Sequence, residues 1–189
     1  GMTKVRLTGG EPLVKRGIVD LVSMIRGVEG VAHLGMTTNG TLLGRFAIEL
    51  KNAGLDSVNV SLDSLNGARY REITRGGDIR DVLDGIWDAI DAGLPVKINM
   101  VVLEDTPETD VAHMRAYCER VGARLQLINH FALDKEKKEG YRFDRPPSCA
   151  HCNRVRLMAD GMVKPCLHSD VEVKLDFARL EESLREAIM

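Results

Sequence analysis

The chain has 189 residues, of which 44% are hydrophobic and 29% charged, and its formal charge is −2 at pH 7. This composition is typical of a globular protein of about one domain, and so small a charge gives no electrostatic case for nucleic acid or an anionic membrane. No apolar run reaches the roughly 20 residues that span a bilayer. The first residues show no signal or lipidation motif, so we expect a cytoplasmic protein.

The first two thirds of the sequence alternate β-rich runs with helical patterns. Strands are expected near residues 4–8, 32–37, 57–62, 96–103 and 124–130, and helices near residues 13–26, 42–53, 79–92 and 109–120. Several of the strands are almost continuously apolar, which is typical of parallel strands buried on both faces. The repeated β-α units predict an α/β fold with a parallel sheet, either doubly wound or part of a barrel. Trp87 and Cys118 fall in the helical patterns and are expected in the core.

The pattern changes after residue 131. A charged run at residues 134–139 and the Pro146-Pro147 pair indicate a linker. Residues 154–158 and 162–167, joined by an Asp-Gly turn, predict a β-hairpin, and residues 176–189 predict an amphipathic helix. We therefore expect three parts, which are a β/α part at residues 1–133, a linker at 134–148 and a cysteine-containing segment at 149–189.

Polar motifs follow the predicted strands at their carboxyl ends, where parallel α/β folds bind ligands. They are Thr-Gly-Gly-Glu-Pro at residues 8–12, Thr-Thr-Asn-Gly at 37–40 and Ser-Leu-Asp-Ser at 61–64. Each motif also has a purely structural interpretation as a turn. In the functional interpretation, Gly9 and Gly10 let a ligand approach the backbone, and Glu11 offers a carboxylate to an amine. Asn99, Gln126, Asn129 and His130 lie in or after the last two strands of the series.

Lys97 interrupts an otherwise apolar strand. A buried lysine is unfavourable unless it is paired or faces a cavity, so a cavity-facing cation suited to phosphate is one interpretation. The other is an exposed position at the start of the strand.

Cys149, Cys152 and Cys166 form a Cys-x2-Cys-x13-Cys series that suits a metal centre better than a disulfide framework. Spacing alone leaves zinc and iron–sulfur both open, because a neighbouring histidine could complete a zinc site. Arg154 and Arg156 alternate along a predicted strand and would reach one face of it, which suits a phosphate or a purine edge.

Together these motifs resemble one family. Residues 6–12 (Arg-Leu-Thr-Gly-Gly-Glu-Pro), 37–40, 60–63 and 97–99 and the cysteine segment 149–167 are similar to the molybdenum cofactor biosynthesis protein A family, the GTP 3′,8-cyclases. This family belongs to the radical S-adenosylmethionine (SAM) superfamily. The resemblance implies an incomplete (β/α)6 barrel in which S-adenosylmethionine is cleaved reductively. The resulting radical takes hydrogen from the GTP ribose, whose carbon then attacks the purine.

The resemblance also implies roles for individual residues. The S-adenosylmethionine contacts would be Gly9, Gly10, Glu11, Thr38 and Ser61. The residues near GTP would be Arg6, Lys97, Arg154 and Arg156. A C-terminal 4Fe–4S cluster, whose open iron meets the guanine, would be held by Cys149, Cys152 and Cys166.

The sequence also departs from the family. The Cys-x3-Cys-x2-Cys motif of the superfamily's first cluster does not occur in it, so we expect the chain by itself to be catalytically incomplete. Gln126-Leu127-Ile128-Asn129 replaces an Arg-Phe-Ile-Glu-like strand, and the stretch between residues 131 and 149 is short. A barrel without its first β-α unit would leave an open edge beside the strand at residues 4–8, which suggests a homodimer.

Two other functions fit parts of the pattern. One is a radical SAM enzyme that modifies a peptide, as in quinone-cofactor biosynthesis, although such proteins carry longer cysteine arrays. The other is a non-catalytic module that binds zinc and a nucleotide.

Overall fold

The computed structural model describes residues 2–130, 153–166 and 170–188, without the side chains of residues 187 and 188. The chain divides into two compact units, Gly1–His130 and Phe131–Met189. The linker at 134–148 and the cysteines at 149 and 152 lie outside the described residues. No helix in the described ranges is long and apolar enough to cross a membrane.

The first unit is a series of β-α units around one parallel sheet. Its strands are β1 (Lys4–Leu7), β2 (His33–Thr38), β3 (Ser57–Ser61), β4 (Val96–Val102) and β5 (Arg124–Asn129). Its helices are η1 (Pro12–Val14), α1 (Ile18–Arg26), α2 (Leu43–Asn52), α3 (Gly67–Thr74), α4 (Ile79–Asp91) and α5 (Glu108–Val121). The five strands are parallel and lie in chain order, β1-β2-β3-β4-β5.

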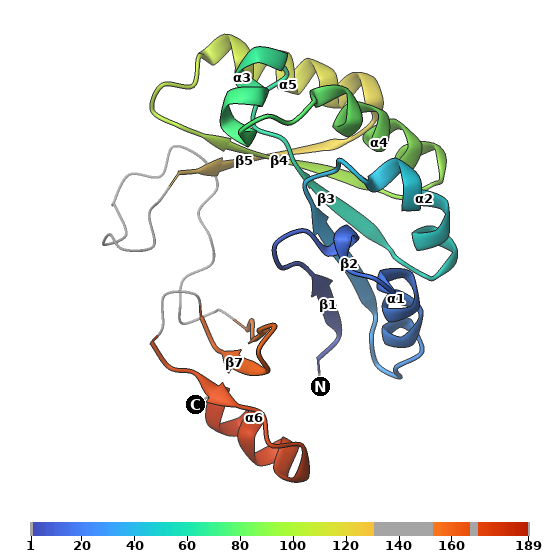
Figure 1. Cartoon of the computed structure of the whole chain (residues 1–189), viewed down its shortest axis with the longest axis vertical. Coiled ribbons are helices and arrows are strands. Elements are labelled where there is room, and N and C mark those ends of the chain that lie inside the picture. Colours follow the sequence, from blue (N-terminus) through green and yellow to red (C-terminus); the bar gives the residue numbers. More distant parts are fainter. Residues whose placement is uncertain (1, 131–152, 167–169, 189) are drawn as a thin grey trace. The chain divides into compact units, whose positions relative to one another are not determined.

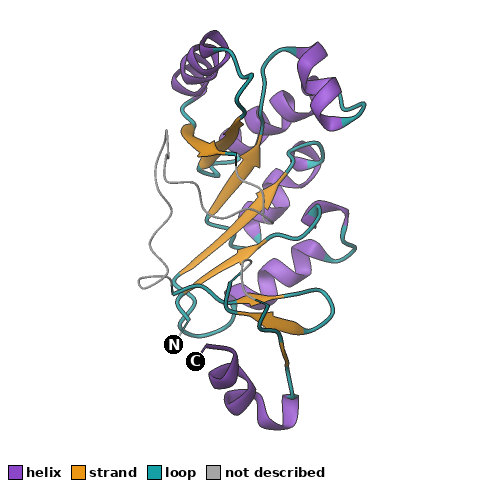
Figure 2. Cartoon of the chain, turned by 90° about the vertical axis from the view of Figure 1, so that its left-hand side faces the viewer, coloured by secondary structure: helices purple, strands orange, loops and turns teal. Residues whose placement is uncertain are grey.

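The helices of this unit lie on one face of the sheet (Figure 1, Figure 2). A doubly wound sheet has helices on both faces, so this alternative from the sequence is wrong. A β/α barrel has its parallel strands in chain order and its helices on one side of the sheet. The described sheet has this arrangement, but it is open because β5 does not pair with β1. The expected partial barrel is therefore confirmed.

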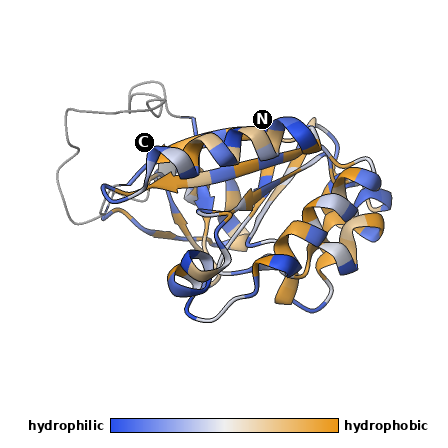
Figure 3. Cartoon of the chain, turned by 90° about the horizontal axis from the view of Figure 1, so that it is seen from above, coloured by the Kyte–Doolittle hydropathy of each residue, from blue (hydrophilic) through white to orange (hydrophobic). Residues whose placement is uncertain are grey.

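The burial of the strands alternates. In β4 the buried residues Val96, Ile98, Met100 and Val102 alternate with partly exposed ones. The expectation of burial on both faces is thus wrong for β4, because every second residue of this strand is partly exposed. The face away from the helices, called here the helix-free face, carries the remaining residues of each strand. Along the helices hydrophobic and hydrophilic residues also alternate (Figure 3), as expected when one side of each helix packs on the sheet.

Helices α2 and α4 pack closely because glycines lie between them. A Cβ atom at Gly85 would be 2.7 Å from the backbone oxygen of Gly40. Gly40 itself has a φ of +85° and lies against Val60 and Val82, so a larger residue there would meet both strain and a clash. This contact fixes the turn between β2 and α2, which is one of the candidate ligand loops.

Some elements differ from the sequence expectations. The first helix is divided into η1, which ends at Val14, and α1, which begins after Gly17 at a φ of 76°. Helix α3 was not expected; it begins after Asn66, whose side chain accepts hydrogen bonds from the backbone N–H groups of Ala68 and Arg69. Trp87 is 48% exposed rather than buried, whereas Cys118 is 3% exposed, as expected.

The second unit contains a small antiparallel sheet of β6 (Arg156–Leu157), β7 (Met162–Lys164) and β8 (Val173–Lys174), followed by η3 (Phe177–Arg179) and α6 (Leu180–Ile188). The expected hairpin is confirmed, and its turn contains Gly161 at a φ of 83° with Asp160 accepting from Met162 N–H. The third strand, β8, was not expected. It is tied to β7 by an ion pair between Lys164 and Glu172.

Candidate functional site

The loop after β1 is an open glycine turn held in place by a carboxylate. Gly9 has a φ of +134°, and no atom lies within 4 Å of a Cβ built at Gly9 or Gly10. The Glu11 carboxylate next to them accepts hydrogen bonds from Leu13 N–H at 3.0 Å and from Asn39 N–H at 2.6 Å. The backbone of the turn is therefore accessible to a ligand, while Glu11 joins it to the loop after β2.

The two threonines at the end of β2 have different environments. Thr38 is 2% exposed, and its hydroxyl donates to Glu11 Oε1 at 2.7 Å and accepts from Gly40 N–H at 3.1 Å. Both hydrogen bonds of this hydroxyl are made within the protein, so Thr38 orients Glu11 in this structure. Thr37 lies on the opposite side of the strand, on the helix-free face, and is partly exposed. Successive side chains of a strand point to opposite faces of the sheet. The sequence could therefore have shown that Thr37 and Thr38 lie on different faces, with the one next to the apolar residues buried.

Ser61, the last residue of β3, is exposed on the helix-free face beside Asn99 of β4, its register partner. The Oδ1 atom of Asn99 is buried and has no hydrogen-bond partner in the described part of the chain. A buried acceptor without a partner is unfavourable, so this oxygen suits a donor group of a ligand. Asp63 follows Ser61, and its Oδ1 accepts from Val101 N–H at 2.8 Å, which continues the β3–β4 pairing past the end of β3.

The helix-free face carries a positive charge. Residues in register on neighbouring parallel strands share a face, which places Thr37, Asn59, Lys97 and Arg124 in one row. The five strands contain no Asp or Glu, and their Lys and Arg residues all belong to this face: Lys4, Arg6, Lys97 and Arg124. The chain as a whole has a charge of −2, so cations are concentrated on this face.

Two of these cations were singled out from the sequence. The guanidinium of Arg6 lies across Gly35, where a Cβ atom would be 3.0 Å from Nη2, and Nη1 donates to Met36 O at 3.4 Å. Lys97 is partly exposed, and its Nζ donates to Gln126 Oε1 at 2.6 Å. Lys97 is the second residue of β4 and lies on the helix-free face, a position that fits both a cavity-facing cation and a partly exposed residue near the start of the strand.

The predicted metal centre can be followed only in part. Cys166 follows β7 and is partly buried, whereas Cys149 and Cys152 lie outside the described residues. Within the described ranges no three His, Cys, Asp or Glu side chains are grouped to hold a metal ion. Arg156 is partly buried in β6 opposite Lys164, and Arg154, before the strand, is exposed.

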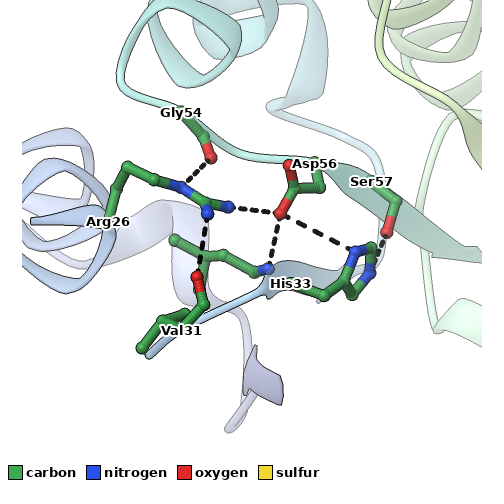
Figure 4. Close-up of polar contacts among 7 residues, drawn as sticks. Arg26, Val31, His33, Gly54, Asp56 and Ser57 are labelled. Atoms are coloured by element: carbon green, nitrogen blue, oxygen red, sulfur yellow. Dashed lines mark hydrogen bonds and ion pairs between the residues drawn. The ribbon is translucent and has the colours of Figure 1, made fainter. Parts of the chain in front are cut away.

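A second polar cluster, not anticipated from the sequence, lies at the opposite ends of the strands (Figure 4). Arg26, from the end of α1, donates through Nε to Gly54 O at 2.9 Å and through Nη1 to Val31 O at 3.2 Å, and it forms an ion pair with Asp56. The same Asp56 oxygen accepts from Leu34 N–H at 2.7 Å. Burial opposes the ionisation of Asp56, but the Leu34 hydrogen bond and Arg26 outweigh it and lower its pKa.

His33 connects this cluster to β3. Its Nδ1 lies 3.7 Å from Asp56 Oδ2, and its Nε2 is 3.1 Å from Ser57 Oγ. The order Asp-His-Ser resembles a hydrolase triad in composition. However, the amino ends of barrel strands are usually structural, and these groups are bound to one another and to the backbone. We therefore interpret the cluster as a structural one that stabilises the fold by joining α1, β2 and β3.

Comparison with known proteins agrees with this fold. The Radical SAM superfamily pattern matches residues 1–118, which is more than half of the chain. An open parallel β/α barrel with a glycine turn after a strand thus places the protein among the radical SAM proteins.

The relatives narrow the assignment. The chain is 36% identical over 238 aligned positions to the GTP 3′,8-cyclase of Alkaliphilus oremlandii, with all of this chain and 74% of that protein covered. It is 37% identical to the GTP 3′,8-cyclase of Thermodesulfovibrio yellowstonii, again with all of this chain and 74% of that protein covered. The chain belongs to the GTP 3′,8-cyclase family of the radical SAM superfamily.

Solved structures support the fold. The structure of native anSMEcpe with bound AdoMet matches with a TM-score of 0.71 at 16% identity, covering 97% of this chain and 66% of that chain. Streptococcus suis SuiB bound to S-adenosylmethionine matches with a TM-score of 0.59 at 19% identity, covering 79% of this chain and 34% of that chain. At such identities the likeness concerns the fold alone.

Proposed function

We propose that this chain binds GTP on the helix-free face and acts in the GTP 3′,8-cyclase reaction of its relatives. The observation that carries the proposal is the concentration of lysine and arginine on one sheet face whose strands contain no carboxylate. A nucleoside triphosphate carries several negative charges at neutral pH, and Arg and Lys are the side chains that bind phosphate. Arg6 and Lys97 would contact the nucleotide from this face. Arg154 and Arg156 are further candidate nucleotide-binding residues, as the family resemblance implies.

The residues at the carboxyl ends of the strands fit S-adenosylmethionine. The backbone at Gly9 and Gly10 is accessible, and its carbonyl oxygens would accept hydrogen bonds from the cofactor's ammonium group. Ser61 and the unpartnered Asn99 oxygen offer polar contacts to a ribose. Glu11, held by Thr38, fixes the turn in this shape. When bound and reductively cleaved, S-adenosylmethionine supplies the radical chemistry; the residues named here bind and orient it.

Cys149, Cys152 and Cys166 are proposed as ligands of a 4Fe–4S cluster. Three thiolates leave one iron open to a ligand that is not cysteine, and Arg154 and Arg156 follow Cys152 closely in the sequence. The tests are iron and sulfide analysis of anaerobically purified protein and replacement of each cysteine by serine. Zinc in place of iron and sulfide would contradict the proposal.

The function is tested by ligand binding, since the four cysteines of this sequence do not include the Cys-x3-Cys-x2-Cys motif and we expect no cleavage of S-adenosylmethionine by the chain itself. Calorimetry should show that GTP binds at least tenfold more tightly than guanosine, and that Lys97→Met removes this preference. Lys15→Met is the control, because Lys15 is exposed and follows η1, outside the sheet. Equal affinity for GTP and guanosine would contradict the proposal, and 5′-deoxyadenosine formation by the reconstituted chain would contradict the expected inactivity.

The sheet edge suggests a homodimer. In the described sheet β1 pairs only with β2, so its outer edge presents backbone groups to another strand. Light scattering coupled to size exclusion should give twice the chain mass of 20.9 kDa, and a monomer at high concentration would argue against this.

A further inference from the structure

The hydrogen bond between Lys97 and Gln126 fixes the orientation of the Gln126 amide. A lysine ammonium only donates hydrogen bonds, whereas a glutamine side chain has one accepting and one donating end. The atom of Gln126 that lies 2.6 Å from Lys97 Nζ must therefore be the oxygen, as the structure has it. It follows that the amide N–H groups point away from the ammonium.

This pair belongs to the helix-free face. Asn99 and Gln126 are register partners on β4 and β5, and Lys97 precedes Asn99 by two residues on the same side of β4. The contact is thus a diagonal pair between neighbouring strands, and both side chains are partly exposed. Arg124 lies two residues before Gln126 on β5 and adds a further positive charge to this face.

The pairing has two chemical consequences. The ammonium lies at the end of a flexible chain, and the hydrogen bond reduces its conformational freedom before a ligand binds. The amide adds N–H donors next to one positive charge without adding a negative charge. The resulting group of donors is complementary to anionic oxygens, which only accept hydrogen bonds.

We propose that Gln126 is a positioning and specificity-determining residue, which together with Lys97 forms a binding pair for an anionic oxygen group of the ligand. Phosphate of GTP and the carboxylate of S-adenosylmethionine share this chemistry. The inference rests on the proposed function, because it places the Lys97–Gln126 pair in the ligand site proposed for the helix-free face. A glutamate at position 126 would neutralise Lys97 and replace donors by acceptors, so the pair would then repel an anion.

The experiment compares the full chain with Gln126→Glu, Gln126→Met and Lys97→Met, with Lys15→Met as a surface-charge control. Calorimetry measures the affinity for GTP, guanosine, inorganic tripolyphosphate and S-adenosylhomocysteine, at two salt concentrations. Gln126→Glu should lower the affinity for GTP and tripolyphosphate at least tenfold and weaken its salt dependence. Gln126→Met should lower it about threefold, the range of one lost neutral hydrogen bond. Guanosine affinity and the melting temperature should be unchanged.

The ligands distinguish the sources of the anion. A tenfold loss for GTP and tripolyphosphate but not S-adenosylhomocysteine assigns the pair to phosphate, and the reverse pattern assigns it to the carboxylate. If the wild-type chain does not prefer GTP to guanosine, the proposed function fails, while a tripolyphosphate loss in Gln126→Glu still supports the pair. Unchanged affinity of Gln126→Glu for every anion, an equal loss for guanosine, or no anion binding by the wild type would overturn the inference.

Discussion

The two ends of the parallel sheet use charge in different ways. At the amino ends of β2 and β3, Arg26, Asp56 and His33 bind one another and nearby backbone groups, so opposite charges are compensated inside the protein. At the carboxyl ends, the carboxylates of Glu11 and Asp63 accept hydrogen bonds from backbone N–H groups. The cations of the strands lie along the helix-free face between the two ends, and the strands carry no carboxylate. A compensated cluster stabilises the fold, whereas a face whose strands carry cations and no carboxylate suits an anionic ligand. If this interpretation is correct, mutations at the two ends should have separable effects.

The largest effect is expected for Glu11→Ala at the carboxyl end. The change removes the acceptor for Leu13 N–H, Asn39 N–H and the Thr38 hydroxyl. It should lower the free energy of unfolding by about 3 kcal/mol, because hydrogen bonds to a charged group contribute about 1.5–3 kcal/mol each and this carboxylate is partly exposed. It should also lower S-adenosylhomocysteine affinity at least tenfold.

Thr38→Val is the matched control, since it removes one of these donors and keeps the side-chain shape. Urea unfolding and calorimetry should show a smaller change in both quantities than Glu11→Ala. If Glu11→Ala changes stability but leaves the affinity unaltered, Glu11 does not shape the ligand site.

Asp56→Ala should have the opposite profile. It leaves Arg26 without its carboxylate and Leu34 N–H without its acceptor, which should cost about 2 kcal/mol of unfolding free energy because both side chains are partly exposed. Ligand affinities should stay within twofold of the wild-type values in calorimetry. His33→Gln, which keeps a polar side chain beside Asp56 and Ser57, is the milder control. A tenfold loss of affinity in Asp56→Ala would show that the two ends are coupled.

The comparison of the two ends also shows what could be predicted from the sequence. The strands and the loop motifs at their ends are recognisable because each is local, and their order fixes one rim of the sheet. The family resemblance identified Gly9, Gly10 and Lys97, and the structure places all three at the carboxyl end or on the helix-free face. Whether Thr37 or Thr38 faces that side follows from the alternation of the strand, but only once one face is known to be buried.

Contacts between distant parts of the chain could not be predicted. Asp56 and His33 are 23 positions apart and belong to no motif in the sequence, and only the pairing of β2 with β3 brings them together. Helix α3 buries only Tyr70 and is otherwise too polar to show an apolar stripe in the sequence, and its start depends on the Asn66 cap. The Lys97–Gln126 hydrogen bond likewise depends on the β4–β5 register.

Asp63→Asn tests the carboxyl end through pH. Burial raises the pKa of Asp63 above its ordinary value of 3.8 and outweighs the hydrogen bond from Val101 N–H. The folded state then holds the proton more tightly than the unfolded state, so stability declines as pH rises from 3.8 through the folded pKa. The asparagine keeps the acceptor without this decline. The difference in unfolding free energy should therefore shift in favour of Asp63→Asn across this interval.

Urea unfolding at several pH values provides the measurement. Asp63→Ala is the control, because it loses the acceptor as well and should be less stable than the wild type at every pH. A constant difference between Asp63→Asn and the wild type would show that the carboxyl is not perturbed in solution.

The smallest effect concerns Cys118, which belongs to neither end and lies on the buried side of α5. Burial raises the pKa of its thiol from 9.0 to about 11, so the reactive thiolate fraction at pH 8 should be about a hundredfold lower than for an exposed cysteine. Peptide mass spectrometry after iodoacetamide treatment should show alkylation of Cys118 only in urea, while Cys118→Ser should change neither ligand affinity nor the reactivity of the other three cysteines. Rapid alkylation of Cys118 in the native protein would mean that α5 opens readily, and β5, which α5 immediately precedes, would then be a poor support for the Lys97–Gln126 pair.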